Sequence, residues 1–265
     1  MNDKIRLPRI LVTNDDGFDA PGLELLTEIA ADISDEVWVI APENDQSGTS
    51  MQVTLHQPLR VTTHSARRFA VRGTPADCVA VALNHFMKEC PPQLILSGIN
   101  AGYNCGDDTN LSGTVGAALA GLMLGVPSVA VSQACPNRKE VRWETARAHL
   151  PTVLQILLQQ GWRKETCVSV NLPDAPPDQI QDMVWTRSSQ KNVSAFRIDA
   201  RTDLRDGDYF WLALNRSAGE LDNASDIAAL KRNQIAVSCL GLDRSINPGR
   251  AAVPLYPESV LHVGT

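Results

Sequence analysis

The sequence lacks the features that mark membrane, disulfide-rich and nucleic-acid-binding proteins. No apolar run approaches the roughly 18 residues of a membrane span, and residues 1–10 contain no apolar signal core. Six cysteines are scattered without a CxxC pair, which favours free thiols in a reducing compartment over a disulfide framework or zinc site. The 24 Lys and Arg against 30 Asp and Glu give a net charge of -6. We therefore predict a cytoplasmic protein without a nucleic acid polymer or a membrane as partner.

Several common catalytic signatures are also missing. The chain has no G-x-x-x-x-G-K-[ST] loop for a nucleoside triphosphate and no G-x-G-x-x-G fingerprint for a dinucleotide. It has no G-x-S-x-G nucleophile elbow, and its five histidines are isolated along the sequence. These absences argue against P-loop, dinucleotide-dependent and serine-hydrolase chemistry.

Strands alternate with helices over the first 170 residues. This pattern predicts an α/β fold, with three Rossmann-like layers around a mostly parallel sheet. The predicted strands cover 9–13, 37–41, 69–71, 94–96, 126–131 and 167–170. The predicted helices cover 21–30, 74–86, 114–124 and 143–160, the last kinked or restarted at Pro151. With 265 residues and 43% hydrophobic content, the chain can bury a sizeable core.

The pattern changes after residue 175. We predict antiparallel strands at 184–187 and 209–214 with a charged turn region at 199–208, then a helix at 225–232 and a last strand at 235–239. The interpretation is a catalytic core at 1–175 and a β-rich C-terminal extension at 176–265 that mediates oligomerisation and returns to the core. Within the core, segments 53–55 and 59–62 suggest a β-hairpin arm at about 51–63.

Three polar clusters follow predicted strands, at 13–17, 44–50 and 97–104. Each contains oxygen-bearing side chains and at least one glycine. Ligands of parallel sheets bind outside the carboxyl ends of the strands, so these clusters should meet at one edge.

The adjacent carboxylates of Asp15 and Asp16 are the most informative pair in these clusters. Two like charges on neighbouring residues repel unless a cation or hydrogen-bond donors neutralise them. With Ser47 and Asn100 they make a plausible oxygen shell for one Mg²⁺ or Mn²⁺, and the absence of His or Cys there argues against zinc. The alternative is a loop that merely ends a strand.

Two short turns favour phosphate binding, namely Ser47-Gly48-Thr49 and Ser112-Gly113-Thr114. The second precedes a predicted helix, whose exposed amides attract anions, although Ser112 as an ordinary N-cap is a compatible alternative. The predicted phosphate-binding residues are Ser47, Gly48, Asn104, Ser112, Gly113 and Thr114. Asn104 has the alternative role of holding its turn, and Tyr103 is a candidate for base stacking by its place in the loop.

Five segments together resemble the survival protein SurE family of metal-dependent 5'/3'-nucleotidases. They are residues 10–17, 41–48, 73–79, 97–104 and 103–115. The resemblance covers about residues 8–135 strongly and continues more weakly to residue 240. The chain departs from the family at Val237-Ser238-Cys239-Leu240, where a Ser-Ile-Thr-Pro-Leu-like strand is usual, and in the proline-containing tail from Asn247.

The resemblance implies a Rossmann-like core and one divalent cation held by Asp15, Asp16, Ser47 and Asn100. It implies nucleoside monophosphates as substrates, with exopolyphosphatase activity as a possible side reaction. It also implies a homodimer or homotetramer in which the hairpin arm and the C-terminal extension exchange contacts.

The hypothesis is phosphomonoester hydrolysis by a metal-activated water, with Asp15 or Asp16 as the catalytic residue that orients or deprotonates it. One rival is a phosphatase with an aspartyl-phosphate intermediate, which typically needs two aspartates separated by one residue. The second rival is a non-catalytic nucleotide- or anion-binding module.

Overall fold

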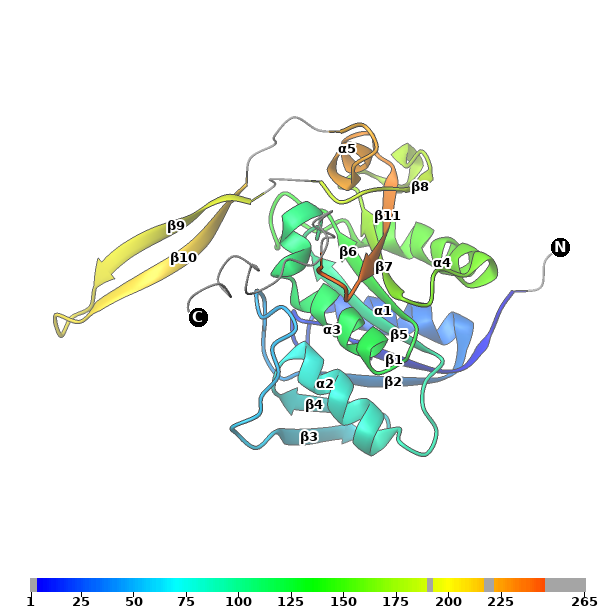
Figure 1. The fold of residues 1–265 in the computed structure, drawn as a ribbon, viewed down its shortest axis with the longest axis horizontal. Coiled ribbons are helices and arrows are strands. Elements are labelled where there is room, and N and C mark those ends of the chain that lie inside the picture. The colour runs from blue at the N-terminus through cyan, green and yellow to red at the C-terminus, as the bar shows by residue number, and fades with distance from the viewer. Residues whose placement is uncertain (1–3, 190–192, 217–221, 246–265) are drawn as a thin grey trace, which may run out of the picture.

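A nine-stranded, mostly parallel sheet forms the centre of the computed structural model, which describes residues 4–189, 193–216 and 222–245 (Figure 1). Its strand order is β3-β4-β2-β1-β5-β6-β7-β11-β8. The strands of this sheet are β1 (Leu7–Thr13), β2 (Ser34–Pro42), β3 (Arg60–Ser65), β4 (Arg68–Arg72), β5 (Leu94–Ala101), β6 (Ser128–Gln133), β7 (Thr166–Leu172), β8 (Met183–Trp185) and β11 (Ile235–Gly241). Two more strands, β9 (Val193–Thr202) and β10 (Asp208–Arg216), form a separate ribbon.

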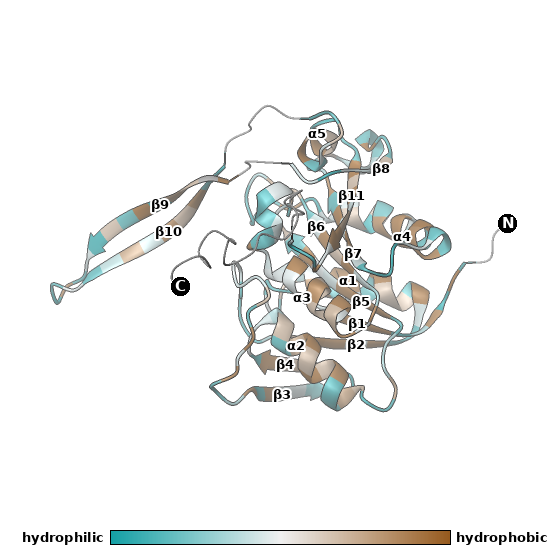
Figure 2. Cartoon of the chain, viewed as in Figure 1, coloured by the Kyte–Doolittle hydropathy of each residue, from teal (hydrophilic) through white to brown (hydrophobic). Residues whose placement is uncertain are grey.

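Helices cover both faces of the sheet, which confirms the predicted three-layer α/β architecture (Figure 1). The helices are α1 (Pro21–Ile33), α2 (Pro75–Val81), α3 (Gly113–Met123), α4 (Trp143–Gln160) and α5 (Asp226–Lys231). Ile10 and Val12 of β1 pack with α1 and α4, whereas Leu11 between them packs with α2 and α3. Because both faces are buried, the central strands are continuously hydrophobic rather than alternating (Figure 2).

Local sequence signals explain where two of the helices begin. Pro21 occupies the first turn of α1. Thr74 and Asp77 form a capping box at the start of α2, in which the Thr74 hydroxyl accepts from the Asp77 amide and the Asp77 carboxylate accepts from the Thr74 amide. Helix α4 runs as one element through Pro151, without the restart that the proline suggested. Among the described residues, no helix has both the length and the apolar character that crossing a bilayer requires.

The predicted hairpin at 53–62 is wrong in its position. Residues 53–59 contain no strand, and β3 instead pairs antiparallel with β4, so that this hairpin forms one edge of the main sheet. The backbone of Thr54 is tied to the carboxylate of Asp77 at 2.9 Å, which holds the segment before β3 against the start of α2.

The region after residue 175 contributes to two places in the fold. Strand β11 pairs antiparallel with β7, and β8 pairs parallel with β11, so the prediction of an antiparallel strand at 184–187 is wrong in direction. Residues 199–202 belong to β9 rather than to a turn, and β9 and β10 form a long antiparallel hairpin that projects from the body (Figure 1, yellow). We call residues 193–216 the arm. The predicted proline-containing tail from Asn247 lies outside the described residues.

Candidate active site

The site lies where the strand order of the sheet reverses. Strand β1 is followed in the sheet by β2 on one side and by β5 on the other, and Thr13 at the end of β1 is in register with Ser97 of β5. A crevice opens at such a switch point outside the carboxyl ends of the strands. The loop after β2 reaches the same place, because the Gln46 amide donates to the backbone carbonyl of Asp15 at 2.7 Å.

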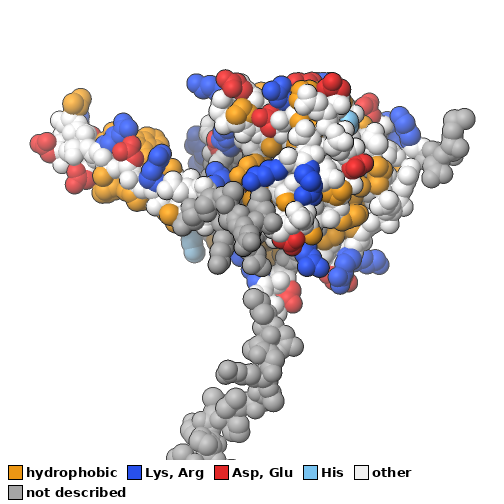
Figure 3. Space-filling view, turned by 90° about the horizontal axis from the view of Figure 1, so that it is seen from above, with side chains coloured by type: hydrophobic (Ala, Val, Ile, Leu, Met, Phe, Trp, Pro, Cys, Tyr) orange, Lys and Arg blue, Asp and Glu red, His pale blue; other side chains and the backbone are white. Residues whose placement is uncertain are grey.

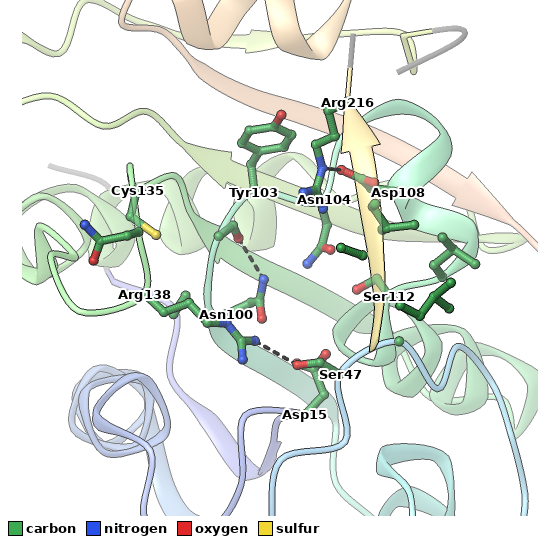
Figure 4. A pocket seen from close by; sticks show the side chains of 18 of the residues that line it. Asp15, Ser47, Asn100, Tyr103, Asn104, Asp108, Ser112, Cys135, Arg138 and Arg216 are labelled. Carbon is green, nitrogen blue, oxygen red and sulfur yellow. Dashed lines mark hydrogen bonds and ion pairs between the residues drawn. The ribbon is translucent and has the colours of Figure 1, made fainter. Parts of the chain in front are cut away.

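A cavity of about 680 Å³ opens at this point (Figure 4). The predicted site residues that line it are Asp15, Ser47, Gly48, Asn100, Asn104 and Ser112. Of the other three predicted residues, Gly113 and Thr114 lie against Asp15, and Asp16 shares the guanidinium of Arg138 with Ser47. The structure thus brings all nine predicted residues together from the loops after β1 and β2, the end of β5 with the loop that follows it, and the start of α3.

Asp15 is a buried carboxylate, with 3% of its surface exposed. Its Oδ1 accepts a hydrogen bond from the Thr114 hydroxyl at 2.5 Å, and the Thr114 amide also donates to this carboxylate. Burial, and after it the charge of Asp16, raises the pKa of Asp15 from 3.8 to about 7. Burial therefore disfavours the charged form of Asp15 by more than the hydrogen bonds from Thr114 favour it.

Asp16 sits beside it on the rim of the cavity. Its Oδ2 accepts from the Ala101 amide at 2.9 Å, which ties the loop after β1 to the end of β5. Its Oδ1 accepts from the guanidinium of Arg138 at 2.6 Å. Burial raises the pKa of Asp16 even though both of these donors oppose the shift.

Ser47 and Asn100 present their oxygens to the same cavity. The hydroxyl and amide of Ser47 both donate to Asp45 Oδ1, at 2.6 and 2.8 Å, which fixes the turn. The side-chain amide nitrogen of Asn100 donates to the Gly102 carbonyl at 2.8 Å. This bond uses the nitrogen of Asn100 and leaves its carbonyl oxygen as the atom suited to a cation.

The predicted phosphate-binding residues differ in what they do in the structure. Ser112 caps α3 by accepting from the Val115 amide at 3.1 Å, and it also lines the cavity. The Asn104 side chain donates to Ser132 at 2.9 Å and so holds its loop against β6. Thr114 is fully buried and supports Asp15 instead of lining the cavity.

Sequence reasoning missed two arginines that line the cavity, Arg138 and Arg216. Arg138 lies in the loop after β6, and its guanidinium contacts Asp16, Asp45 and Ser47 at 2.6, 2.7 and 2.7 Å. Hydrogen bonds from Ser47 and Arg138 outweigh the partial burial of Asp45, so the pKa of Asp45 is lowered. One sequence feature could have pointed to Arg138. It lies in the loop after the carboxyl end of β6, which runs parallel to β5 in the sheet.

The base of the arm closes the other end of the cavity (Figure 4). Arg216 donates to the buried Asp108 carboxylate at 2.8 Å, and its guanidinium lies 5.9 Å from the centre of the Tyr103 ring. Phe196 and Leu212 of the arm add apolar surface to the same wall. No sequence signal linked Phe196, Leu212 or Arg216 to the site, because these arm residues are distant in the chain from every polar cluster.

The donor set fits a hard cation rather than zinc. Within the described ranges, no group of three or more His, Cys, Asp or Glu side chains is arranged to bind a metal. The candidate ligands are the carboxylates of Asp15 and Asp16, the hydroxyl of Ser47 and the side-chain amide of Asn100. Each of these groups offers an oxygen to a cation. A positive group already lies among them, since the guanidinium of Arg138 bridges Asp16 and Ser47.

Comparison with known proteins decides the family. The family model described as Survival protein SurE matches residues 10–195. The chain belongs to the SurE family. A SurE relative from Burkholderia lata, named 5'-nucleotidase SurE 1, is 44% identical over 89% of this chain and 92% of its own length. The 5'-nucleotidase SurE of Methylorubrum populi is also 44% identical, over 91% of this chain and 95% of its own.

A solved SurE structure supports the fold independently. The SurE protein from Aquifex aeolicus is 30% identical and superposes with a TM-score of 0.77, covering 90% of this chain and 95% of the other. The predicted SurE resemblance is thereby confirmed.

Proposed function

We propose that this chain hydrolyses nucleoside 5'-monophosphates, and 3'-monophosphates as well, to nucleoside and phosphate. Relatives with 44% identity over about nine-tenths of the chain carry the name 5'-nucleotidase. The observation that carries the proposal is the pair of neighbouring carboxylates, buried Asp15 and part-buried Asp16, at the switch point of the sheet beside a cavity of about 680 Å³. That volume falls within the range of small-molecule sites.

Asp15, Asp16, Ser47 and Asn100 would hold one divalent cation per subunit, Mg²⁺ or Mn²⁺. When bound, such an ion polarises a phosphoryl oxygen and lowers the pKa of a coordinated water. The raised pKa of Asp15 supports this assignment, because a cation would offset the burial of its carboxylate and, after that, the repulsion from Asp16.

The remaining roles belong to the chain's own groups. Asp15 or Asp16 orients the attacking water and accepts its proton. Asn104, Ser112 and the Gly48 turn hold the phosphoryl oxygens, and Gly113 and Thr114 keep Asp15 in place from behind. Tyr103, half-buried beside Arg216, offers a face for the base.

Two further properties are part of the proposal. The apolar side chains exposed on the arm suit a homodimer or homotetramer, since isolated two-stranded ribbons are marginally stable. The six cysteines, all within the described part of the chain, form no disulfide, which agrees with a cytoplasmic location. Hydrolysis of short polyphosphate at the same cavity is the proposed side activity.

The test measures phosphate release from a panel of nucleoside 5'- and 3'-monophosphates, with Mn²⁺ and with a chelator. We expect turnover that depends on the metal, and a loss of about a hundredfold or more in Asp16→Asn at saturating Mn²⁺. Asp19→Asn, an exposed carboxylate in the same loop, is the matched control and should retain full turnover. Nucleotide binding without phosphate release would instead identify a binding module, and near-normal turnover of Asp16→Asn would refute the ligand assignment.

A further inference from the structure

Arg138 places a positive charge inside the candidate site. Its Nη2 donates to Ser47 Oγ at 2.7 Å (Figure 4) and to Asp16 Oδ1 at 2.6 Å. Its Nη1 donates to Asp45 Oδ2 at 2.7 Å. Two of these three partners, Asp16 and Ser47, belong to the proposed metal ligands. The third, Asp45, does not.

A guanidinium and a divalent cation compete for these oxygens, because like charges repel and each short bond occupies a lone pair. Binding of an ion therefore favours release of Nη2 from Asp16 and Ser47. The Nη1–Asp45 bond involves neither ligand, so it can persist and keep the guanidinium at the rim.

The side chain has the freedom that this change requires. Arg138 lies in the loop between β6 and α4, and 48% of its side chain is exposed. Arg216, the other arginine that lines the cavity, is held by the carboxylate of Asp108, which is only 4% exposed. The Arg216 side chain is 46% exposed, much like Arg138, but its partner Asp108 is not a proposed metal ligand. Arg138 is therefore the cavity-lining arginine whose contacts a bound cation would change.

We propose that Arg138 has two successive partners. Without metal it neutralises the acidic site, and when metal binds it swings on its Asp45 contact to donate its freed nitrogen to the phosphoryl group of the substrate. The planar guanidinium suits this second role, since it matches the oxygens of a phosphate better than a point charge does. This inference rests on the proposed function for its second half, whereas the competition with metal stands without it.

The two roles of Arg138 predict that one substitution strengthens the binding of metal and weakens the binding of nucleotide. Removing the guanidinium in Arg138→Gln should tighten Mn²⁺ binding, measured by calorimetry or by electron paramagnetic resonance without nucleotide, by at least about threefold. The same variant should raise KM for the nucleotide by about ten- to a hundredfold, the loss expected for hydrogen bonds to a charged group. Arg138→Lys keeps the charge but loses the fork, so its Mn²⁺ affinity should stay near that of the native protein while KM still rises.

Arg142→Gln is the matched control. Arg142 lies four residues further on, pairs with Asp174 at 3.0 Å and does not line the cavity. Its loss should change neither the Mn²⁺ affinity nor KM, and circular dichroism should show that all variants are folded.

Unchanged or weaker Mn²⁺ binding in Arg138→Gln would overturn the competition. An unchanged KM in an active Arg138→Gln would overturn the phosphate contact. If the native protein released no phosphate from any nucleotide, the proposed function would fail, and the Mn²⁺ affinities would still decide whether Arg138 competes with the ion.

Discussion

The pKa of Asp15 depends strongly on the groups that surround its carboxylate. Its pKa rises from 3.8 to about 7 mainly because of burial, and next because of the charge of Asp16; Thr114 and Arg138 oppose the rise without cancelling it. Between these two pH values the folded, metal-free protein binds more protons than the unfolded chain. Its stability therefore falls as pH rises from about 4 to 7 and stays at the lower level above pH 7.

Asp15→Asn should stabilise the metal-free protein at alkaline pH. The amide keeps an oxygen that can accept from Thr114 but carries no charge, so at pH 8 in chelator the free energy of unfolding should rise, by up to about 4 kcal/mol since one pKa unit is about 1.4 kcal/mol. At pH 4.5 the native Asp15 is itself protonated, and the two proteins should unfold at similar urea concentrations.

Urea unfolding at the two pH values measures this difference. Asp19→Asn, at an exposed position, should match the native protein at both. A variant that is less stable than the native protein at pH 8, or equally shifted at both pH values, would show that the charge of Asp15 is not what limits stability.

The residues of the site were predictable to different degrees. Asp15, Ser47 and Asn100 follow buried strands, and the rule that parallel strands end at one edge was enough to group them. Arg138 was not predictable as a partner of Asp16, because a lone arginine in a loop has no pattern and its contact depends on how that loop folds back.

At the scale of elements, helix α3 is held close to the loops of the site by its glycines. A Cβ on Gly116 would lie well inside the 3.0 Å that real Cβ atoms keep from the Ser50 carbonyl oxygen. A Cβ on Gly113 would lie 2.8 Å from the Cβ of Asp15. The small residues therefore set the distance between α3 and the loops after β1 and β2.

Gly116→Ala should destabilise the protein, although Gly to Ala within a helix ordinarily stabilises it by about 1 kcal/mol. The added methyl meets backbone that has to shift, and we expect a loss of about 1–3 kcal/mol in urea unfolding. Displacement of the 47–50 turn should also lower phosphate release. Met123→Ala, at an exposed position of the same helix, is the control and should change neither quantity. If Gly116→Ala unfolds at the same urea concentration as the native protein, the loop at Ser50 can move aside without a cost in stability.

The elements that sequence patterns located best were the buried ones. Strands β1, β2 and β5 are apolar on both faces, and the capping box at Thr74 gives a clear helix start. The end of strand β9 was mistaken for a turn because its charged residues, Asp199 and Arg201, continue without a break into the charged turn that follows Thr202. In a two-stranded ribbon neither face is covered by a helix, so charges are tolerated in its middle and the usual hydrophobic signal is absent.

At the scale of the whole molecule, the arm is the feature that exposes large apolar side chains to solvent in the single chain. It pairs with no strand of the main sheet, and Figure 3 shows apolar side chains gathered along it. Phe210 is 64% exposed and Trp211 63% exposed. The homo-oligomer proposed above would cover this apolar surface, on a ribbon that is marginally stable alone.

Replacing Ile198 and Phe210 by serine should therefore lower the oligomeric state. The register pairs Ile198 with Leu212 and Phe210 with Ala200, so the two changes remove apolar surface from one face of the ribbon without touching residues that line the cavity. Light scattering coupled to size-exclusion chromatography should show a smaller assembly at micromolar concentration. Met123→Ser removes a comparably exposed apolar side chain from α3, away from the arm, and should leave the assembly intact. If the double variant keeps the native mass, the arm does not hold the subunits together, and its contacts with the rim of the cavity through Arg216 would remain its demonstrated role.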